Sequence, residues 1–306
     1  MKKIVTLVLV LISGLSYAQQ DAQFSNYMYN TLSFNPAYAG SRGTTSIYLS
    51  QRKQWVGLEG APSTNSLSYH SPLGSSNVGI GLSLLNDAIG PVEENLISLD
   101  VSYSIRTSYD SQLAFGLRAS AHMLNVDFTQ LNIFNPSDVL AQSNINNRVS
   151  PNIGFGMFWY SDKSYVGFSI PNLLETRHIN KGLNSSVSSI SKERLHYHFT
   201  AGHVFKISQD ILFKPAILTK IVSGAPFQLD LSSNFQVYDK FTIGASYRLD
   251  AAVSFLGGFQ INRNWLLGYA YDFDTNNLST YNSGSHEVFL RYEIFRSNRV
   301  RSPRFF

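Results

Sequence analysis

Between residues 44 and 295 the chain alternates apolar and polar residues in about fourteen short runs. From Leu113 to Met123, for example, the odd positions are apolar, while the even positions hold Ala, Gly, Arg, Ser and His. A membrane-spanning β-barrel has this period of two because each strand shows one face to lipid and the other to the lumen. The pattern predicts an all-β fold, a transmembrane antiparallel up-and-down β-barrel of about 14 strands.

The connections between the runs alternate in length. The short ones are 72–76, 107–110, 161–163, 208–210, 238–240 and 262–264, and most of those between them are longer: 55–60, 86–92, 125–149, 172–193 and 274–284. Outer-membrane barrels have short periplasmic turns and longer extracellular loops. This alternation favours such a barrel over a soluble β-sandwich, whose strands also alternate. An even number of strands then places both ends of the barrel in the periplasm.

The first eighteen residues predict a secretory signal peptide. Lys2 and Lys3 precede an apolar stretch over 4–12, and Ser16-Tyr17-Ala18 stands before Gln19. We therefore expect four parts: a signal peptide over 1–18, an N-terminal periplasmic segment or plug over 19–43, an outer-membrane barrel over 44–295 and a basic tail over 296–306. The expected location is the outer membrane, reached through the Sec pathway.

Composition narrows the chemistry. The chain has no cysteine, so disulfides, a lipid-anchored N-terminal cysteine and thiolate chemistry are excluded. It has 24 basic and 20 acidic residues, and losing Lys2 and Lys3 leaves a formal charge of about +2, too balanced for a nucleic-acid partner.

We expect neither an enzyme nor a cofactor or metal site. In Ser285-His286-Glu287 the serine and histidine are adjacent, so in a strand they point to opposite faces and cannot act as nucleophile and base. His196 and His198 share a face, but the sequence identifies no third ligand beside them.

The polar face of the runs collects charges of both signs. Because opposite charges pair, we expect an internal salt-bridge network in the lumen rather than an ion-selective pore. The expected network comprises Asp100, Arg106, Arg118, His196, His198, Asp230, Arg248, Asp272, Glu287 and Arg291.

The same face collects nine glycines: Gly79, Gly81, Gly116, Gly154, Gly156, Gly167, Gly202, Gly244 and Gly268. Glycine inside a strand marks a bend or a place where another backbone comes close. Two hypotheses follow, and the sequence does not choose between them. Either the aromatic segment over 19–43 folds into or across the periplasmic mouth, or the glycines only ease the curvature of the barrel.

Several sequence blocks resemble a known family. They are Asp21-Ala22-Gln23-Phe24-Ser25-Asn26-Tyr27, Phe34-Asn35-Pro36-Ala37-Tyr38-Ala39-Gly40, Arg52-Lys53-Gln54-Trp55-Val56-Gly57-Leu58, Asn86-Asp87-Ala88-Ile89-Gly90-Pro91, Gly224-Ala225-Pro226-Phe227-Gln228-Leu229-Asp230, Gly268-Tyr269-Ala270-Tyr271-Asp272 and Ser283-Gly284-Ser285-His286-Glu287. Their order and their spread from Gln20 to Arg291 make the chain similar to the PorP/SprF family of Bacteroidetes outer-membrane proteins. Ala22 stands where the family usually has proline.

The resemblance implies a component of the type IX secretion system that supports secretion or surface attachment of particular cargo proteins, including gliding adhesins. The implied partners are outer-membrane lipid, a cargo protein with a C-terminal sorting domain, and periplasmic subunits linked to the cell wall. The candidate partner-binding residues are Phe24, Tyr27, Asn35, Pro36, Tyr38 and Trp55. Trp55 is also placed where an aromatic girdle at the membrane interface would lie. The alternative function is an outer-membrane porin or small-molecule channel.

Overall fold

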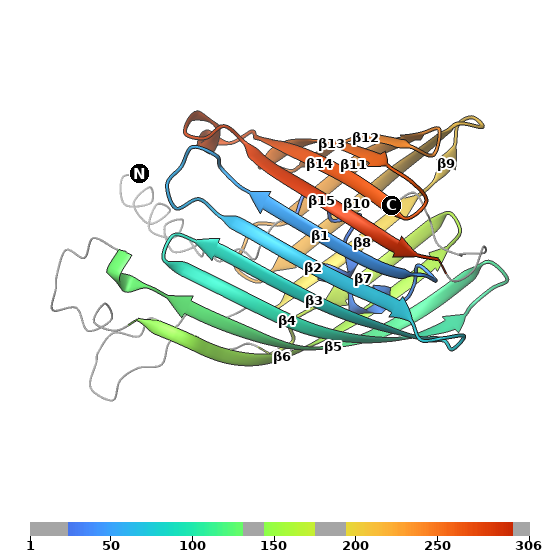
Figure 1. The fold of residues 1–306 in the computed structure, drawn as a ribbon, viewed down its shortest axis with the longest axis horizontal. Coiled ribbons are helices and arrows are strands. Elements are labelled where there is room, and N and C mark those ends of the chain that lie inside the picture. Colours follow the sequence, from blue (N-terminus) through green and yellow to red (C-terminus); the bar gives the residue numbers. More distant parts are fainter. Residues whose placement is uncertain (1–23, 131–143, 175–193, 296–306) are drawn as a thin grey trace, which may run out of the picture.

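The computed structural model describes residues 24–130, 144–174 and 194–295, and these form one β-barrel (Figure 1). The expected signal peptide and basic tail lie outside the described residues. The strands are β1 (Thr45–Lys53), β2 (Ser63–Pro72), β3 (Val78–Ile89), β4 (Val92–Arg106), β5 (Ser111–Val126), β6 (Ile145–Ser161), β7 (Ser164–Ile170), β8 (His196–His203), β9 (Phe205–Lys206), β10 (Ile211–Val222), β11 (Gln228–Val237), β12 (Phe241–Arg248), β13 (Ala252–Gln260), β14 (Trp265–Asp274) and β15 (Ser285–Ile294).

The sheet closes on itself. Every paired neighbour is antiparallel, β1 pairs with β15, and the β10–β11 pairing completes the ring. Because β8 and β9 both pair with β10, they are two pieces of one interrupted strand, and the barrel has fourteen strand positions. The predicted antiparallel barrel of about 14 strands is therefore confirmed. The helices in the described residues are short 3-10 turns, and none of them is long and apolar enough to cross a membrane.

The period of two gives each strand an apolar outer face and a small or polar inner face. On β5, Leu117 is 66% exposed while its neighbour Arg118 is buried inside, and on β12 Ile243 is exposed while Thr242 is buried. Exposed large apolar side chains on the outside of a barrel are the surface that lipid covers.

The two rims differ. One rim carries the short connections, which are 73–77, 107–110, 162–163, 207–210, 238–240 and 261–264, and the other carries the remaining connections between strands, including 54–62, 127–144, 171–195 and 275–284. We call these the short-turn rim and the long-loop rim. The start of β1 and the end of β15 meet at the short-turn rim, where Thr45 pairs with Ile294.

The prediction of a loop over 86–92 was wrong. Strand β3 continues to Ile89 and β4 begins at Val92, so only Gly90 and Pro91 make the turn, and Gly90 has a φ of +53° that suits glycine. The polar residues Asn86 and Asp87 lie within β3. The side chain of Asn86 hydrogen-bonds to Asn95 of β4, and that of Asp87 accepts from Thr64 of β2. Likewise β5 and β6 extend into the predicted loop 125–149. Strands β4, β5 and β6, with 15, 16 and 17 residues, make this side of the barrel taller than that of β7, with 7 residues.

Residues 24–43 lie inside the barrel; we call them the inner segment. It contains two single-turn helices, η1 (Thr31–Ser33) and η2 (Pro36–Tyr38). Nearly all of its residues are buried, and within the described part of the chain two apolar clusters combine them with inward-facing wall residues.

Candidate functional site: the lumen and its outer mouth

The inner segment runs the height of the lumen. At the long-loop rim, the backbone N–H of Ser25 donates to the carboxylate of Glu287 at 3.0 Å. At the short-turn rim, Arg42 Nε lies 2.6 Å from Glu293 Oε1. Glu287 and Glu293 are six residues apart on β15, which corresponds to about 20 Å along a strand. One of the two hypotheses placed the segment in or across the mouth of the barrel; in the structure it extends through the lumen from the short-turn rim to the long-loop rim.

Three arginines on the wall hold the segment in the same manner. Each pairs with a wall carboxylate and also donates at least one hydrogen bond to the inner segment, as the fork geometry of guanidinium allows. Arg52 lies 2.6 Å from Asp272 and 3.4 Å from Glu287 and donates to Ser25 Oγ at 2.9 Å. Arg118 and Arg248 repeat this arrangement.

Arg118 Nε lies 2.7 Å from Asp100, and its terminal nitrogens donate to the carbonyls of Leu32 and Ser33. Arg248 Nε lies 2.7 Å from Asp230, and its Nη2 donates to the carbonyl of Phe24 at 3.3 Å. Because all these ion pairs are buried, removing one partner would leave an uncompensated charge in the lumen.

A row of small residues crosses strands β3 to β6 of the wall. Gly79 pairs with Ser102, Ser102 with Gly116 and Gly116 with Gly156, so the four lie side by side on β3 to β6. A Cβ on Gly79 would collide with the carbonyl of Ala39, and a Cβ on Gly116 would collide with the backbone of Ala37. Residues 35–39 therefore rest directly on the wall.

Polar contacts fix the segment on this row. Ser102 Oγ donates to the carbonyl of Ala39 at 2.7 Å. Asn35 accepts from the N–H of Ala37 at 3.0 Å, which caps η2, and donates to the carbonyl of Met157 at 3.1 Å. Other inward glycines have a different role: Gly202, Gly244 and Gly268 give room to the side chains of Tyr165, Asn234 and Phe289.

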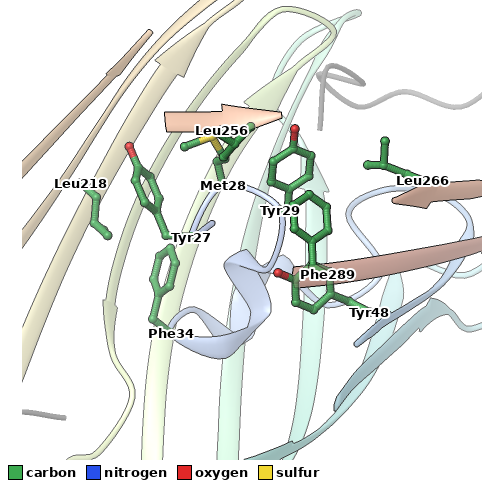
Figure 2. Close-up of a cluster of buried hydrophobic side chains, with 9 residues drawn as sticks. All are labelled: Tyr27, Met28, Tyr29, Phe34, Tyr48, Leu218, Leu256, Leu266 and Phe289. Carbon is green, nitrogen blue, oxygen red and sulfur yellow. The ribbon is translucent and has the colours of Figure 1, made fainter. Parts of the chain in front are cut away.

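Aromatic packing fills the space between the segment and the wall (Figure 2). The rings of Tyr29 and Phe289 are 4.4 Å apart, and Phe289 stacks on Tyr48 of β1 at 5.6 Å. On the opposite side Tyr38 packs edge-on against Phe158 at 5.3 Å. Inward aromatic rings would face water in an open lumen, so the inner segment provides the cover that makes them favourable.

The candidate partner-binding residues separate into two groups. Tyr27, Asn35, Pro36 and Tyr38 are buried in the lumen, where they contact the barrel itself. Phe24 is half-buried at the long-loop rim, and Trp55 is half-buried in the connection after β1 with a φ of +46°. In this arrangement only Phe24 and Trp55 are placed for a partner at the surface.

The residues of the expected lumen network occupy different places. Asp100 with Arg118 and Asp230 with Arg248 form pairs, and Asp272 and Glu287 share Arg52. Arg106 is exposed at the end of β4 and lies outside these pairs. His196 is buried, and His198 stacks on Phe34 at 5.5 Å. Arg291 lies 4.0 Å from Glu293.

Sequence reasoning missed Arg42 and Arg52 as network members. Arg52 has the inward parity of β1, as Ser46, Tyr48 and Ser50 do, and this parity could have found it. The part of the chain that the structure describes holds no group of three or more His, Cys, Asp or Glu residues able to bind a metal ion.

A cavity of about 140 Å³ opens at the long-loop end of the lumen; we call it the outer vestibule. The inner segment contributes Phe24, Tyr27, Ser33 and Phe34 to its lining. The wall contributes apolar residues, among them Leu85 and Leu96, and charged residues of both signs. Since Ser33 and Phe34 lie between this cavity and the small-residue row, the vestibule is a pocket with a floor.

Comparison with known proteins gives one family. The model of the family described as "Type IX secretion system membrane protein PorP/SprF" matches residues 16–292. No curated protein matches the chain.

Among solved structures, the CymD monoaromatic hydrocarbon channel is 13% identical, with 87% of this chain and 93% of that chain covered and a TM-score of 0.49. The TodX monoaromatic hydrocarbon channel deltaS2 mutant is 11% identical, with 85% and 92% covered and a TM-score of 0.46. The Acinetobacter baumannii outer membrane protein Omp33 is 8% identical, with 82% and 99% covered and a TM-score of 0.44.

Proposed function

The chain belongs to the PorP/SprF family of type IX secretion system membrane proteins, and on this basis we propose that it supports the secretion or surface attachment of particular cargo proteins. The cargo carries a C-terminal sorting domain and includes gliding adhesins. The protein acts as a docking component in the outer membrane, with its long loops toward the cargo and its short turns toward periplasmic subunits linked to the cell wall.

The observation that carries this proposal is the placement of the inner segment. Residues 24–43 are packed in the lumen by ion pairs, backbone hydrogen bonds and aromatic contacts from both sides. A porin needs a continuous aqueous path, which this packing opposes. A barrel with such a filled lumen is suited to holding a partner at its surface, because loops on a rigid scaffold carry recognition.

A gene deletion in the native host tests the proposal. The secreted and surface proteins of the deletion strain are compared with those of a strain that carries the restored gene. We expect a small set of proteins with C-terminal sorting domains to be lost from the surface of the deletion strain. An unchanged set would contradict the proposal.

Affinity purification identifies the partners. The tagged protein is extracted gently from outer membranes, and the proteins that accompany it are identified by mass spectrometry. Recovery of the same surface protein, or of cell-wall-linked periplasmic subunits, is expected. A barrel that purifies alone, together with measurable conductance in a lipid bilayer, would favour the porin alternative.

A further inference from the structure

The outer vestibule is built on strands whose polarity reverses toward the long-loop rim. On the outer face of the barrel, Asn65, Asn86 and Asn95 pair in register across β2, β3 and β4. Their side chains form a ladder in which Asn65 donates to Asn86 at 3.3 Å and Asn86 donates to Asn95 at 2.9 Å. Since the next outward row toward the short-turn rim is apolar, with Leu84 paired to Ile97, the ladder marks the upper edge of the lipid-facing surface.

At the same height, the inner face of these strands is apolar. Leu85 of β3 pairs directly with Leu96 of β4, and both side chains line the vestibule. Elsewhere on this wall the inward positions hold residues such as Ser83, Ser98 and Asp100, which are buried under the inner segment. Here the strands turn an apolar pair toward an opening that water reaches, which is unfavourable unless something apolar covers it.

Each side of the vestibule carries charges of both signs. Asp87 and Glu94 on β3 and β4 lie beside the leucine pair, and Arg118 on β5 lies on the same side. On the facing side the lining includes Lys220 of β10 and the paired side chains of Asp230 and Arg248. An occupant that matches this lining has an apolar group with polar or charged groups beside it, which an extended polypeptide provides and a hydrocarbon does not.

The size of the cavity limits the occupant further. A volume of about 140 Å³ admits one or two large side chains and not a folded domain. Because the inner segment forms its floor, the vestibule is a binding pocket and not part of a channel through the barrel.

We propose that the outer vestibule is a docking site for an extended segment of the cargo polypeptide, which inserts a large apolar side chain against Leu85 and Leu96. The inference rests on the proposed function, because it assigns the place where the cargo of that function binds.

Photo-crosslinking in intact host cells tests the site. A benzoylphenylalanine is introduced in place of Leu96, which faces the vestibule, or in place of its neighbour Asn95, which faces outward. We expect the probe at 96, and not at 95, to form an adduct with a protein that the deletion strain loses from its surface. An adduct of small mass only, no adduct, or equal adducts at 95 and 96 would overturn the proposal.

A pair of double variants provides the second measurement. Leu85→Ser with Leu96→Ser removes the apolar pair, and Asn86→Ser with Asn95→Ser is the matched change on the outer face. We expect the first to lower the amount of cargo at the surface about tenfold and the second to leave it unchanged. The level of folded barrel is followed in both by its heat-modifiable mobility on gels.

The two proposals fail in different ways. If the deletion strain loses cargo but the Leu85 and Leu96 variant retains it at the level of its matched control, the docking site is refuted and the proposed function stands. If the deletion strain loses no surface protein, the proposed function is refuted, and the docking site with it.

Discussion

The side-chain amide of Asn35 occupies the place that a Cβ on Gly156 would take. Asn35 is fully buried, and its amide caps η2 and donates to the neighbouring Met157 carbonyl. The glycine on β6 and the asparagine on the inner segment thus require each other. The small-residue row is a contact surface that fits this segment, and a substitution at any of its glycines tests that contact.

Adding a side chain to the small-residue row should displace the inner segment. We expect Gly116→Val to destabilise the folded protein by roughly 1–3 kcal/mol, because the new atoms collide with backbone that cannot swing away. The measurement is the denaturant midpoint of the purified barrel in detergent. Gly257→Ala is the control, since a Cβ there meets nothing within 4 Å, and it should leave the midpoint in place. Equal midpoints for both variants would mean that the stability of the protein does not depend on the contact between the inner segment and the small-residue row.

Removing the segment should open the lumen. Deletion of residues 19–40 takes away the side chains that cover Phe158, Phe289 and the wall ion pairs. We expect the single-channel conductance in a planar bilayer to rise well above that of the intact chain. Unchanged, low conductance after the deletion would show that the segment does not close the barrel.

The buried cluster at Arg52 should be the most sensitive ion pair. Arg52→Met leaves the carboxylates of Asp272 and Glu287 without their shared cation, and we expect a loss of roughly 3–5 kcal/mol in the free energy of unfolding. Urea unfolding in detergent measures this loss.

Neutralising the whole cluster supplies the control. Arg52→Met combined with Asp272→Asn and Glu287→Gln leaves no buried charge uncompensated, so most of the lost stability should return. If the triple variant is as unstable as Arg52→Met alone, the loss comes from packing or from the contact with Ser25, and not from charge.

The barrel and part of its ion-pair network could be predicted from the sequence. The period of two predicts the strands, and a short turn fixes the register between the two strands that it joins. Asp100 and Arg118 are eighteen residues apart around one short turn, and Asp230 and Arg248 are eighteen apart around another, so both pairs face each other across a hairpin.

Other features depend on contacts that no local pattern contains. Arg52 meets Asp272 and Glu287 only because the ring closes between β1 and β15. The stretch over 86–92 resembled a loop because Asn86 and Asp87 are polar; that Asn86 bonds to Asn65 and Asn95 on the neighbouring strands becomes clear only once the strand pairing is known. The path of the inner segment follows from wall contacts far along the chain, so the glycines alone left two hypotheses open.

The direction of the inner segment gives the last prediction. Its first described residue, Phe24, lies at the long-loop rim, although β1 starts at the short-turn rim. Because the chain has no cysteine, a single introduced thiol reports one position. We expect Phe24→Cys to react with a membrane-impermeant maleimide on intact cells, as the loop control Glu59→Cys does, whereas Ser75→Cys in a short turn should react only after the outer membrane is permeabilised. If Phe24→Cys behaves like Ser75→Cys, the segment enters and leaves at the periplasmic mouth, and the outer vestibule loses the part of its lining that Phe24 supplies.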